Sequence, residues 1–200
     1  MAVAFGIGID GGGTRSRAIA VSLEGELLGE VSGGPLNYNT TSAGTFSESL
    51  GAILQQFSEV HGLDSAAEQT VIGTASLFTS LDHGEVARLC GGLLPAERLT
   101  VVGDVISALF GATLGAPGLL VVSGTGSIAA AMDEQGRCRT TGGLGPAIGG
   151  DPGSARWIAN EVLLHASAES CNGDRLNELT GLVCGHFGVA SFQELIPEIY

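Results

Sequence analysis

The chain has 200 residues, of which 44% are hydrophobic and 14% charged, and its 33 glycines indicate many tight turns. This composition is typical of a globular protein and excludes a disordered chain. The formal net charge of −13 argues against nucleic acid and anionic membranes as partners, because both require basic surfaces.

All eight basic residues are arginine, which excludes a Walker A loop and a Schiff-base lysine. The N-terminal residues MAVAFG lead into a strand without the basic segment or cleavage site of a signal peptide. No apolar run approaches the roughly 18 residues of a membrane span. We therefore expect a soluble, cytoplasmic protein.

Apolar alternation and short apolar runs predict strands, in chain order at 4–10, 17–24, 27–32, 70–76, 99–103, 119–123, 127–132 and 137–141. Apolar residues at helical spacing predict helices, at 42–60 (N-capped by Thr41 or Ser42), 83–94, 105–114, 154–169, 174–187 and 191–199. The mixed order of these elements indicates an α/β protein.

The Gly115–Gly118 segment is the best domain boundary in the chain. It predicts an N-terminal domain over 1–116 and a second domain over 117–200. Each begins with a hairpin whose turn is rich in Gly, Thr and Ser, which indicates a weak duplication of architecture.

The first hairpin turn follows a strand that ends in Asp10. Its residues Gly11, Gly12 and Gly13 allow successive N–H groups to approach an anion, and Thr14 adds a hydroxyl donor. Asp10 beside this turn could hold Mg²⁺ directly or through water. The alternative is a Gly-rich turn without a ligand.

The stretch from Gly6 to Gly11 also matches the dinucleotide-binding pattern GxGxxG. That motif requires a helix after the glycines, where this sequence predicts a strand.

The second hairpin turn, Ser123–Ser127, offers similar donors without a carboxylate. Alone it fits an ordinary turn and a phosphate-binding turn equally well; paired with the first turn, it suggests two sites for one polyphosphate.

Asp104 ends another strand, where α/β sheets expose their site residues. It could cap the next helix, and it could accept a proton from a hydroxyl that attacks a phosphate.

Polar residues elsewhere have two readings each. Asn37 and Asn39 lie in a predicted loop. Their side chains could stabilise a turn, or their amides could hydrogen-bond the hydroxyls of a sugar. Asp151 could cap a helix or bind polar ligand groups. The four cysteines form no CxxC pair and are interpreted as ordinary thiols, at Cys90, Cys138, Cys171 and Cys184.

Five stretches, taken in order, resemble the N-acetylglucosamine kinase/BadF-BcrA ATPase group of the actin-like ATPase superfamily, which includes hexokinase and Hsp70. They are IGIDGGGTRSRA, SGGPLNYN, VVGDVISALFGA, VVSGTGSIA and GGLGPAIGGDPGSARWIANEVL. The resemblance implies a ribonuclease-H-like fold in two lobes with a cleft between them. It implies transfer of the ATP γ-phosphoryl group to the 6-hydroxyl of an amino sugar, N-acetylglucosamine or glucosamine.

The resemblance also implies residue roles. Asp10 would handle Mg²⁺ and its water, and Asp104 would be the catalytic base. The ATP phosphates would be held by Gly11, Gly12, Gly13, Thr14, Thr125 and Gly126. The sugar would be contacted by Asn37, Ser127, Gly143, Gly145 and Asp151.

The sequence departs from the family pattern in three places. The stretch GGLGPAIGGDPGS is one residue longer than usual, with Leu144 for Trp and Pro152 for Glu. Ile128 stands where some acetyl-sugar kinases carry Asn, which leaves the choice of amino sugar open. Family members continue for about another hundred residues, so we expect a truncated second lobe with uncovered apolar sheet edges.

Two other functions remain open. The ATPase activator of a radical dehydratase, from the same group, would need bridging cysteines for an iron–sulfur cluster. A non-catalytic sugar or nucleotide sensor would keep the cleft without turnover. The sequence leaves a homodimer open.

Overall fold

A computed structural model describes residues 4–38, 40–63, 67–75, 77, 80–145, 147–170 and 178–199. The chain divides into two compact units, Met1–Leu120 with Ala130–Cys138, and Val121–Ala129 with Arg139–Tyr200. Asn39 and Cys171, considered above, lie outside the described residues. The predicted division into domains at 116/117 stays a proposal.

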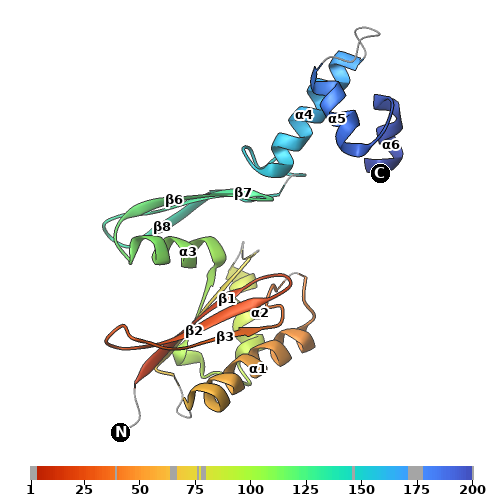
Figure 1. The fold of residues 1–200 in the computed structure, drawn as a ribbon. Helices are drawn as coiled ribbons and strands as arrows, with labels where there is room; N and C mark the ends of the chain where they lie inside the picture. The colour runs from red at the N-terminus through yellow and green to blue at the C-terminus, as the bar shows by residue number, and fades with distance from the viewer. Residues whose placement is uncertain are drawn as a thin grey trace. The chain divides into compact units, whose positions relative to one another are not determined.

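The first unit is built on a five-stranded sheet in the order β3-β2-β1-β4-β5 (Figure 1). Its strands are β1 (Phe5–Gly11), β2 (Ser16–Ser22), β3 (Leu27–Gly33), β4 (Gln69–Thr74) and β5 (Leu99–Gly103). The first three strands pair antiparallel, whereas β4 runs parallel to β1 and β5 runs parallel to β4. The three parallel strands therefore end at the same edge.

Strand β1 alternates strictly, because Phe5, Ile7 and Ile9 are buried while the residues between them face the other side of the sheet. The buried face packs against helix α1 (Ala43–His61) through Phe46, Leu50, Ile53 and Phe57, and against α2 (Ser80–Cys90). Helix α3 (Asp104–Thr113) lies over the opposite face, where the Ser107 side chain abuts Gly73 of β4. The α/β class predicted from the sequence is confirmed.

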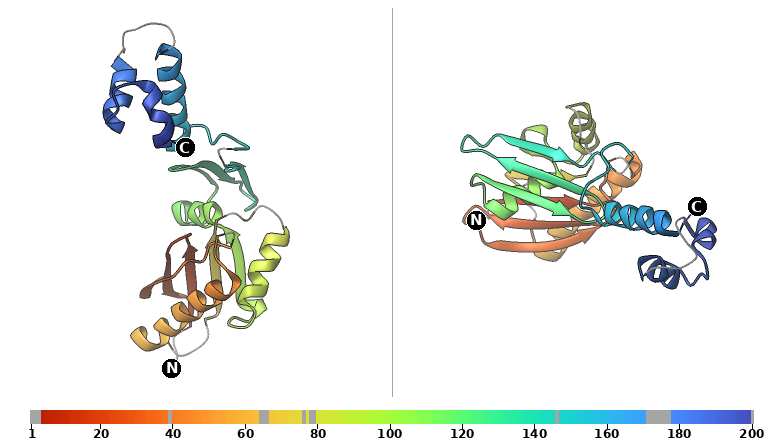
Figure 2. Two further views of the ribbon diagram at one scale, coloured as in Figure 1. Left: turned by 90° about the vertical axis from the view of Figure 1, so that its right-hand side faces the viewer. Right: turned by 90° about the horizontal axis from the view of Figure 1, so that it is seen from above.

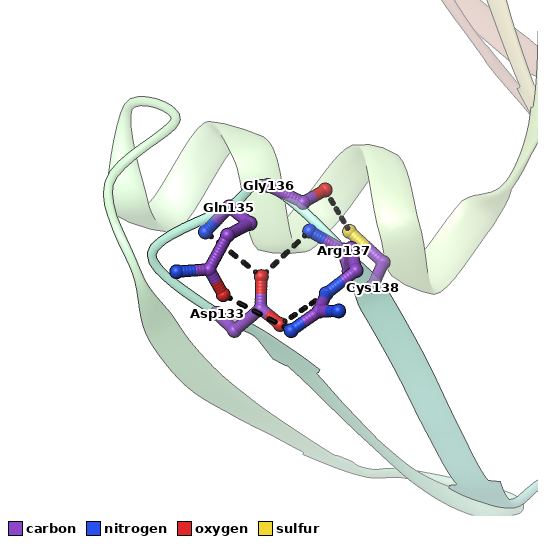
Figure 3. A network of polar contacts seen from close by, with 5 residues as sticks. All are labelled: Asp133, Gln135, Gly136, Arg137 and Cys138. Carbon is purple, nitrogen blue, oxygen red and sulfur yellow. Dashed lines mark hydrogen bonds and ion pairs between the residues drawn. The ribbon is translucent and has the colours of Figure 1, made fainter.

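A second, three-stranded sheet has the order β6-β7-β8, with strands β6 (Gly118–Ser123), β7 (Ser127–Met132) and β8 (Cys138–Gly142). Figure 3 shows the turn between β7 and β8, where the Asp133 carboxylate accepts the backbone N–H groups of Gln135 and Arg137, each at 2.9 Å. The Arg137 Nε–H also donates to this carboxylate, at 2.7 Å. On the edge strand β6, the side chains of Leu119 and Val121 are exposed.

The second unit ends in helices α4 (Ala155–Ser170), α5 (Glu178–Phe187) and α6 (Ile196–Ile199), with the 3-10 helix η2 (Phe192–Leu195) before α6. Helices α4 and α5 lie side by side (Figure 2). They share a small core with η2 in which Ala166, Val183 and Leu195 are buried. No helix among the described residues is long and apolar enough to cross a membrane.

One predicted helix is shifted. The sequence predicts a helix over 83–94, whereas α2 ends at Cys90. Gly91 and Gly92 follow, and the N–H groups of Leu93 and Leu94 both donate to the Cys90 carbonyl in a closing turn. Two consecutive glycines disfavour further helix, so the chain leaves α2 before Pro95 and forms a 3-10 helix at Ala96–Arg98 instead.

Candidate functional site

The predicted carboxylates of the first unit lie at one edge of its sheet. Gly11 at the end of β1 pairs with Thr74 of β4, and Thr74 pairs with Gly103 of β5. Asp10 and Asp104 therefore emerge from strand ends separated by a single strand, about 10 Å apart on ordinary strand spacing. Both carboxylates belong to exposed residues. The parallel register thus brings together two residues that are 94 positions apart in sequence, from the difference 104 − 10.

The phosphate-binding turn predicted at Gly11–Thr14 is tightly folded. The Gly12 N–H donates to the Arg15 carbonyl at 3.1 Å, and a Cβ added to Gly12 would lie 2.5 Å from that oxygen. Only glycine fits this close approach of backbone to backbone. The next residues, Gly13 and Thr14, are exposed. The turn therefore presents its tip to solvent while its base is held in place.

Asp10 shares an open pocket of about 330 Å³ with an ion pair that the sequence alone did not single out. Its strand partner in the register is Arg17, whose guanidinium pairs with Glu30 through Nε at 3.1 Å and through Nη2. The hydrogen bond and charge of Glu30, with a smaller effect of Asp10, raise the pKa of Arg17. The alternation of side chains along the paired strands β1, β2 and β3 could have revealed this cluster from the sequence. It places the side chains of Asp10, Arg17 and Glu30 on the same face of the sheet.

Asn37 lies beside the turn at Gly11–Thr14. A Cβ on Gly13 would be 4.0 Å from the Asn37 amide nitrogen, and the Leu36 N–H donates to the Gly12 carbonyl at 3.0 Å. The structure therefore places the predicted sugar contact next to the predicted phosphate site.

Asp104 is the first residue of α3, and Gly103 is its N-cap. The helix thus begins one residue before the predicted start at Val105, and the Asp104 side chain is not the cap. One carboxylate oxygen, Oδ1, accepts the Val105 N–H at 2.7 Å. This bond holds the carboxylate at the start of α3.

The second turn, in the second unit, is joined to the Gly-rich segment that follows β8. The hydroxyls of Ser123 and Ser127 donate to the carbonyls of Gly153 and Pro152, at 2.9 and 2.8 Å. The Ala155 N–H donates to the Gly124 carbonyl at 2.8 Å. Thr125 at the tip of the turn is exposed. Three hydrogen bonds therefore hold the turn and this segment together.

Asp151 is the most constrained of the predicted residues. It is 5% exposed, has a left-handed backbone with φ of 43°, and accepts the Gly145 N–H on Oδ1 at 3.1 Å. A Cβ on Gly126 would lie 2.8 Å from its other oxygen. Gly143 is bonded to the Ser127 carbonyl at 2.9 Å. All six predicted residues of this unit therefore belong to one loop cluster, formed by Thr125, Gly126, Ser127, Gly143, Gly145 and Asp151.

The acidic groups fit a magnesium ion held mainly by phosphate and water, and they do not fit a cluster of protein ligands. Among the described residues, no three His, Cys, Asp or Glu side chains gather as a metal site. One carboxylate beside a phosphate cradle is the usual protein share of a Mg²⁺–nucleotide site. Of the described cysteines, Cys90 and Cys184 are buried and Cys138 is half-buried, and all three are free thiols.

Sequence comparison identifies relatives that are named as sugar kinases. An N-acetylmuramic acid/N-acetylglucosamine kinase of Clostridium acetobutylicum is 30% identical over 97% of this chain and 63% of its own length. An N-acetyl-D-glucosamine kinase of Dictyostelium discoideum is 27% identical over 97% of this chain and 64% of its own length. The chain therefore spans slightly less than two thirds of these curated relatives.

The fold has a close counterpart among solved structures. A candidate N-acetylglucosamine kinase from Chromobacterium violaceum superposes with a TM-score of 0.71 and 25% identity, over 98% of this chain and 68% of that chain. Residues 7–178 match the BadF/BadG/BcrA/BcrD ATPase family. This chain, with the predicted ribonuclease-H-like α/β fold of actin-like ATPases, belongs to the BadF/BadG/BcrA/BcrD ATPase family.

Proposed function

We propose that this protein is an ATP-dependent kinase that phosphorylates the 6-hydroxyl of an amino sugar, N-acetylglucosamine or glucosamine. The observation that carries the proposal is the edge formed by β1, β4 and β5, where a glycine turn, Asp10 and Asp104 lie within one unit. A phosphate cradle, a carboxylate for a hydrated cation and a second carboxylate for a proton are the parts that phosphoryl transfer to an alcohol requires.

In this proposal, Asp104 accepts the proton of the sugar 6-hydroxyl while the hydroxyl oxygen forms a bond to the γ-phosphorus of ATP. The bond between the γ-phosphorus and the bridging β,γ-oxygen breaks, and ADP leaves. The bond from the Val105 N–H to Asp104 Oδ1 orients the carboxylate and leaves its other oxygen to serve as the base. At the exposed tip of the first turn, the Gly13 N–H and the Thr14 hydroxyl bind phosphate oxygens. The Gly12 N–H instead closes the turn through the Arg15 carbonyl, and Gly11 is paired within the sheet. Thr125 and Gly126 of the second unit are proposed as further phosphate contacts. Mg²⁺ held at Asp10 would neutralise charge that develops on the phosphates.

Sugar contacts are proposed for Asn37 in the first unit and for Ser127, Gly143, Gly145 and Asp151 in the second. The position of Ile128 bears on the choice between the two sugars. Its side chain packs under the loop, since a Cβ on Gly143 would lie 2.7 Å from Ile128 Cδ1. An apolar group there offers no hydrogen bond to an acetyl group, which leaves both amino sugars as substrates to be compared.

A coupled ADP-release assay on the 200-residue chain and on any longer version of it tests the proposal, with N-acetylglucosamine, glucosamine, glucose and no sugar. We expect amino-sugar-dependent release, and we expect Asp104→Asn to reduce its rate by about 100-fold or more. The amide oxygen of the substituted side chain can still accept the Val105 N–H, so the variant removes the base while it keeps the local fold. Thermal unfolding by circular dichroism serves as the control for folding.

Each alternative has its own result in this assay. Sugar-independent hydrolysis would favour the ATPase activator, and binding of sugar and nucleotide without ADP release in a longer version of the chain would favour the sensor. Sugar-dependent release that survives Asp104→Asn would overturn the assignment of the base.

A further inference from the structure

Leu36, the residue before Asn37, is tied through both of its backbone groups. Its N–H donates to the Gly12 carbonyl at 3.0 Å, and its carbonyl accepts the Thr74 hydroxyl at 2.8 Å. Leu36 itself is fully buried. The Asn37 loop, residues 34–38, is therefore anchored on one side to the phosphate-binding turn and on the other side to β4.

The surrounding packing leaves little space for the loop and the turn to move independently. A Cβ on Gly11 would lie 3.0 Å from both the Gly73 carbonyl and the Leu36 Cβ. The Ser16 hydroxyl, just after the turn, donates to the Gly34 carbonyl at 2.8 Å. Because the interior is close-packed at this point, a shift of the turn must be passed to the loop.

Thr74 occupies the centre of this arrangement. It is fully buried at the end of β4, and its strand partners are Gly11 on one side and Gly103 on the other. Asp10 precedes the first of these glycines and Asp104 follows the second. Thr74 is thus placed to hold the site together without contact to a ligand of its own.

We propose that Thr74 is a positioning residue that couples the Asn37 loop to the phosphate-binding turn, so that phosphate bound at the turn orders the loop that contacts the sugar. The functional part of this inference rests on the proposed kinase function. Its physical basis is the carbonyl of the buried residue Leu36, which loses its hydroxyl donor when the Thr74 side chain is replaced by an apolar one. Leaving a buried carbonyl without its donor is costly.

The same strand supplies a matched control. Thr70 lies four residues before Thr74 on the same face of β4 and is also buried, and its hydroxyl has no hydrogen-bond partner in the described structure. Thr74→Val and Thr70→Val therefore make the same chemical change, but only the first removes a hydrogen bond. Thr74→Ser keeps the hydroxyl that donates to the Leu36 carbonyl. Thr74→Ala also removes this hydroxyl and replaces Thr74→Val in the test if Thr74→Val does not fold.

Hydrogen–deuterium exchange of the full chain without ligand tests the coupling directly. We expect Thr74→Val to accelerate exchange in both the Asn37 loop and the turn 11–15 by roughly tenfold, the loss of about one hydrogen bond. Thr70→Val and Thr74→Ser should match the wild type. Unchanged exchange in Thr74→Val, or an equal change in Thr70→Val, would overturn the inference.

Calorimetric titration of N-acetylglucosamine and glucosamine, with and without MgADP, tests the functional consequence. In the wild type, MgADP should tighten sugar binding; in Thr74→Val this enhancement should be lost, with the affinity for MgADP alone changed less than about twofold. An enhancement retained in Thr74→Val would overturn the coupling. Wild-type protein that binds neither sugar would instead refute the proposed substrate, and the exchange result would still decide the role of Thr74.

Discussion

At the scale of single residues, the two glycines of the second turn differ sharply in what surrounds them. Gly126 faces the Asp151 carboxylate, 2.8 Å from where a Cβ would lie, whereas nothing lies within 4 Å of such an atom on Gly124. The two positions are two residues apart in the same turn. Their glycines therefore have different physical reasons to be present.

We predict that Gly126→Ala destabilises the chain by about 1–3 kcal/mol, because the new methyl group must displace a buried carboxylate. Gly124→Ala should change stability by less than about 0.5 kcal/mol. Urea unfolding followed by circular dichroism measures both. Equal effects of the two substitutions would show that Asp151 does not pack against Gly126 in solution.

Cys90 makes the free energy of unfolding depend on pH in the alkaline range. Burial raises the pKa of its thiol from an ordinary value of 9.0 to about 11. As the pH rises, the Cys90 thiol loses its proton in the unfolded chain before it does so in the folded chain. The contribution of the buried thiol to the free energy of unfolding is therefore complete below about pH 9 and is lost towards about pH 11. We predict that the urea midpoint falls less steeply over this range in Cys90→Ala than in the wild type. Parallel pH profiles of the two proteins would contradict the prediction.

At the scale of secondary-structure elements, helix α1 has defined ends. Its N-cap is Ser42, whose hydroxyl accepts the Thr45 N–H at 3.2 Å, and Gly62 ends it in a left-handed conformation with φ of 65°. The sequence allowed Thr41 or Ser42 as the cap, and the structure selects Ser42. The neighbouring Thr41 hydroxyl has no partner in the described structure.

We predict that Ser42→Ala lowers the free energy of unfolding by about 1 kcal/mol, through loss of the cap. Ser42→Asp should retain most of the stability, because its carboxylate can accept the same N–H. Thr41→Ala is the matched control and should have a much smaller effect. A larger effect at Thr41 than at Ser42 would place the start of the helix one residue earlier.

At the scale of the whole molecule, charge dominates the long-range energetics. The chain carries 21 acidic and 8 basic residues, for a formal net charge of −13. The ion pairs Arg17–Glu30, Arg88–Glu85 and Arg137–Asp133 are exposed, so solvent and salt screen them and they offset little of the repulsion. Mutual repulsion of the excess carboxylates should therefore destabilise the folded chain at low ionic strength.

We predict that the melting temperature rises between about 0.01 M and 0.15 M salt, where the Debye length shortens from about 30 Å to about 8 Å. A gain of about 1 kcal/mol corresponds to about 2–4 °C for a chain of this size. Differential scanning calorimetry in sodium chloride measures the shift. A melting temperature that falls with salt would mean that local ion pairs outweigh the net repulsion.

Local chemistry explains why so much could be predicted from the sequence. Strand alternation, the glycine turn after Asp10 and the cap of α1 depend on neighbouring residues, so the sequence by itself determined the order of the elements and the α/β class. The candidate site residues rest on the motifs and the family resemblance, and they stay predictions. The end of α2 was predicted less well: the sequence predicts a helix to residue 94, whereas Gly91 and Gly92 end it at Cys90.

Contacts between distant segments were decided only by the tertiary structure. The parallel register of β1, β4 and β5 brings Asp10 near Asp104, and the pairing of Arg17 with Glu30 depends on a hairpin register. Thr70 and Thr74 look alike in the sequence, as threonines of one strand, yet only Thr74 reaches the Leu36 carbonyl. The physical reason is that a hydrogen bond across 38 residues depends on where the chain packs, and local residue preferences carry no information about that.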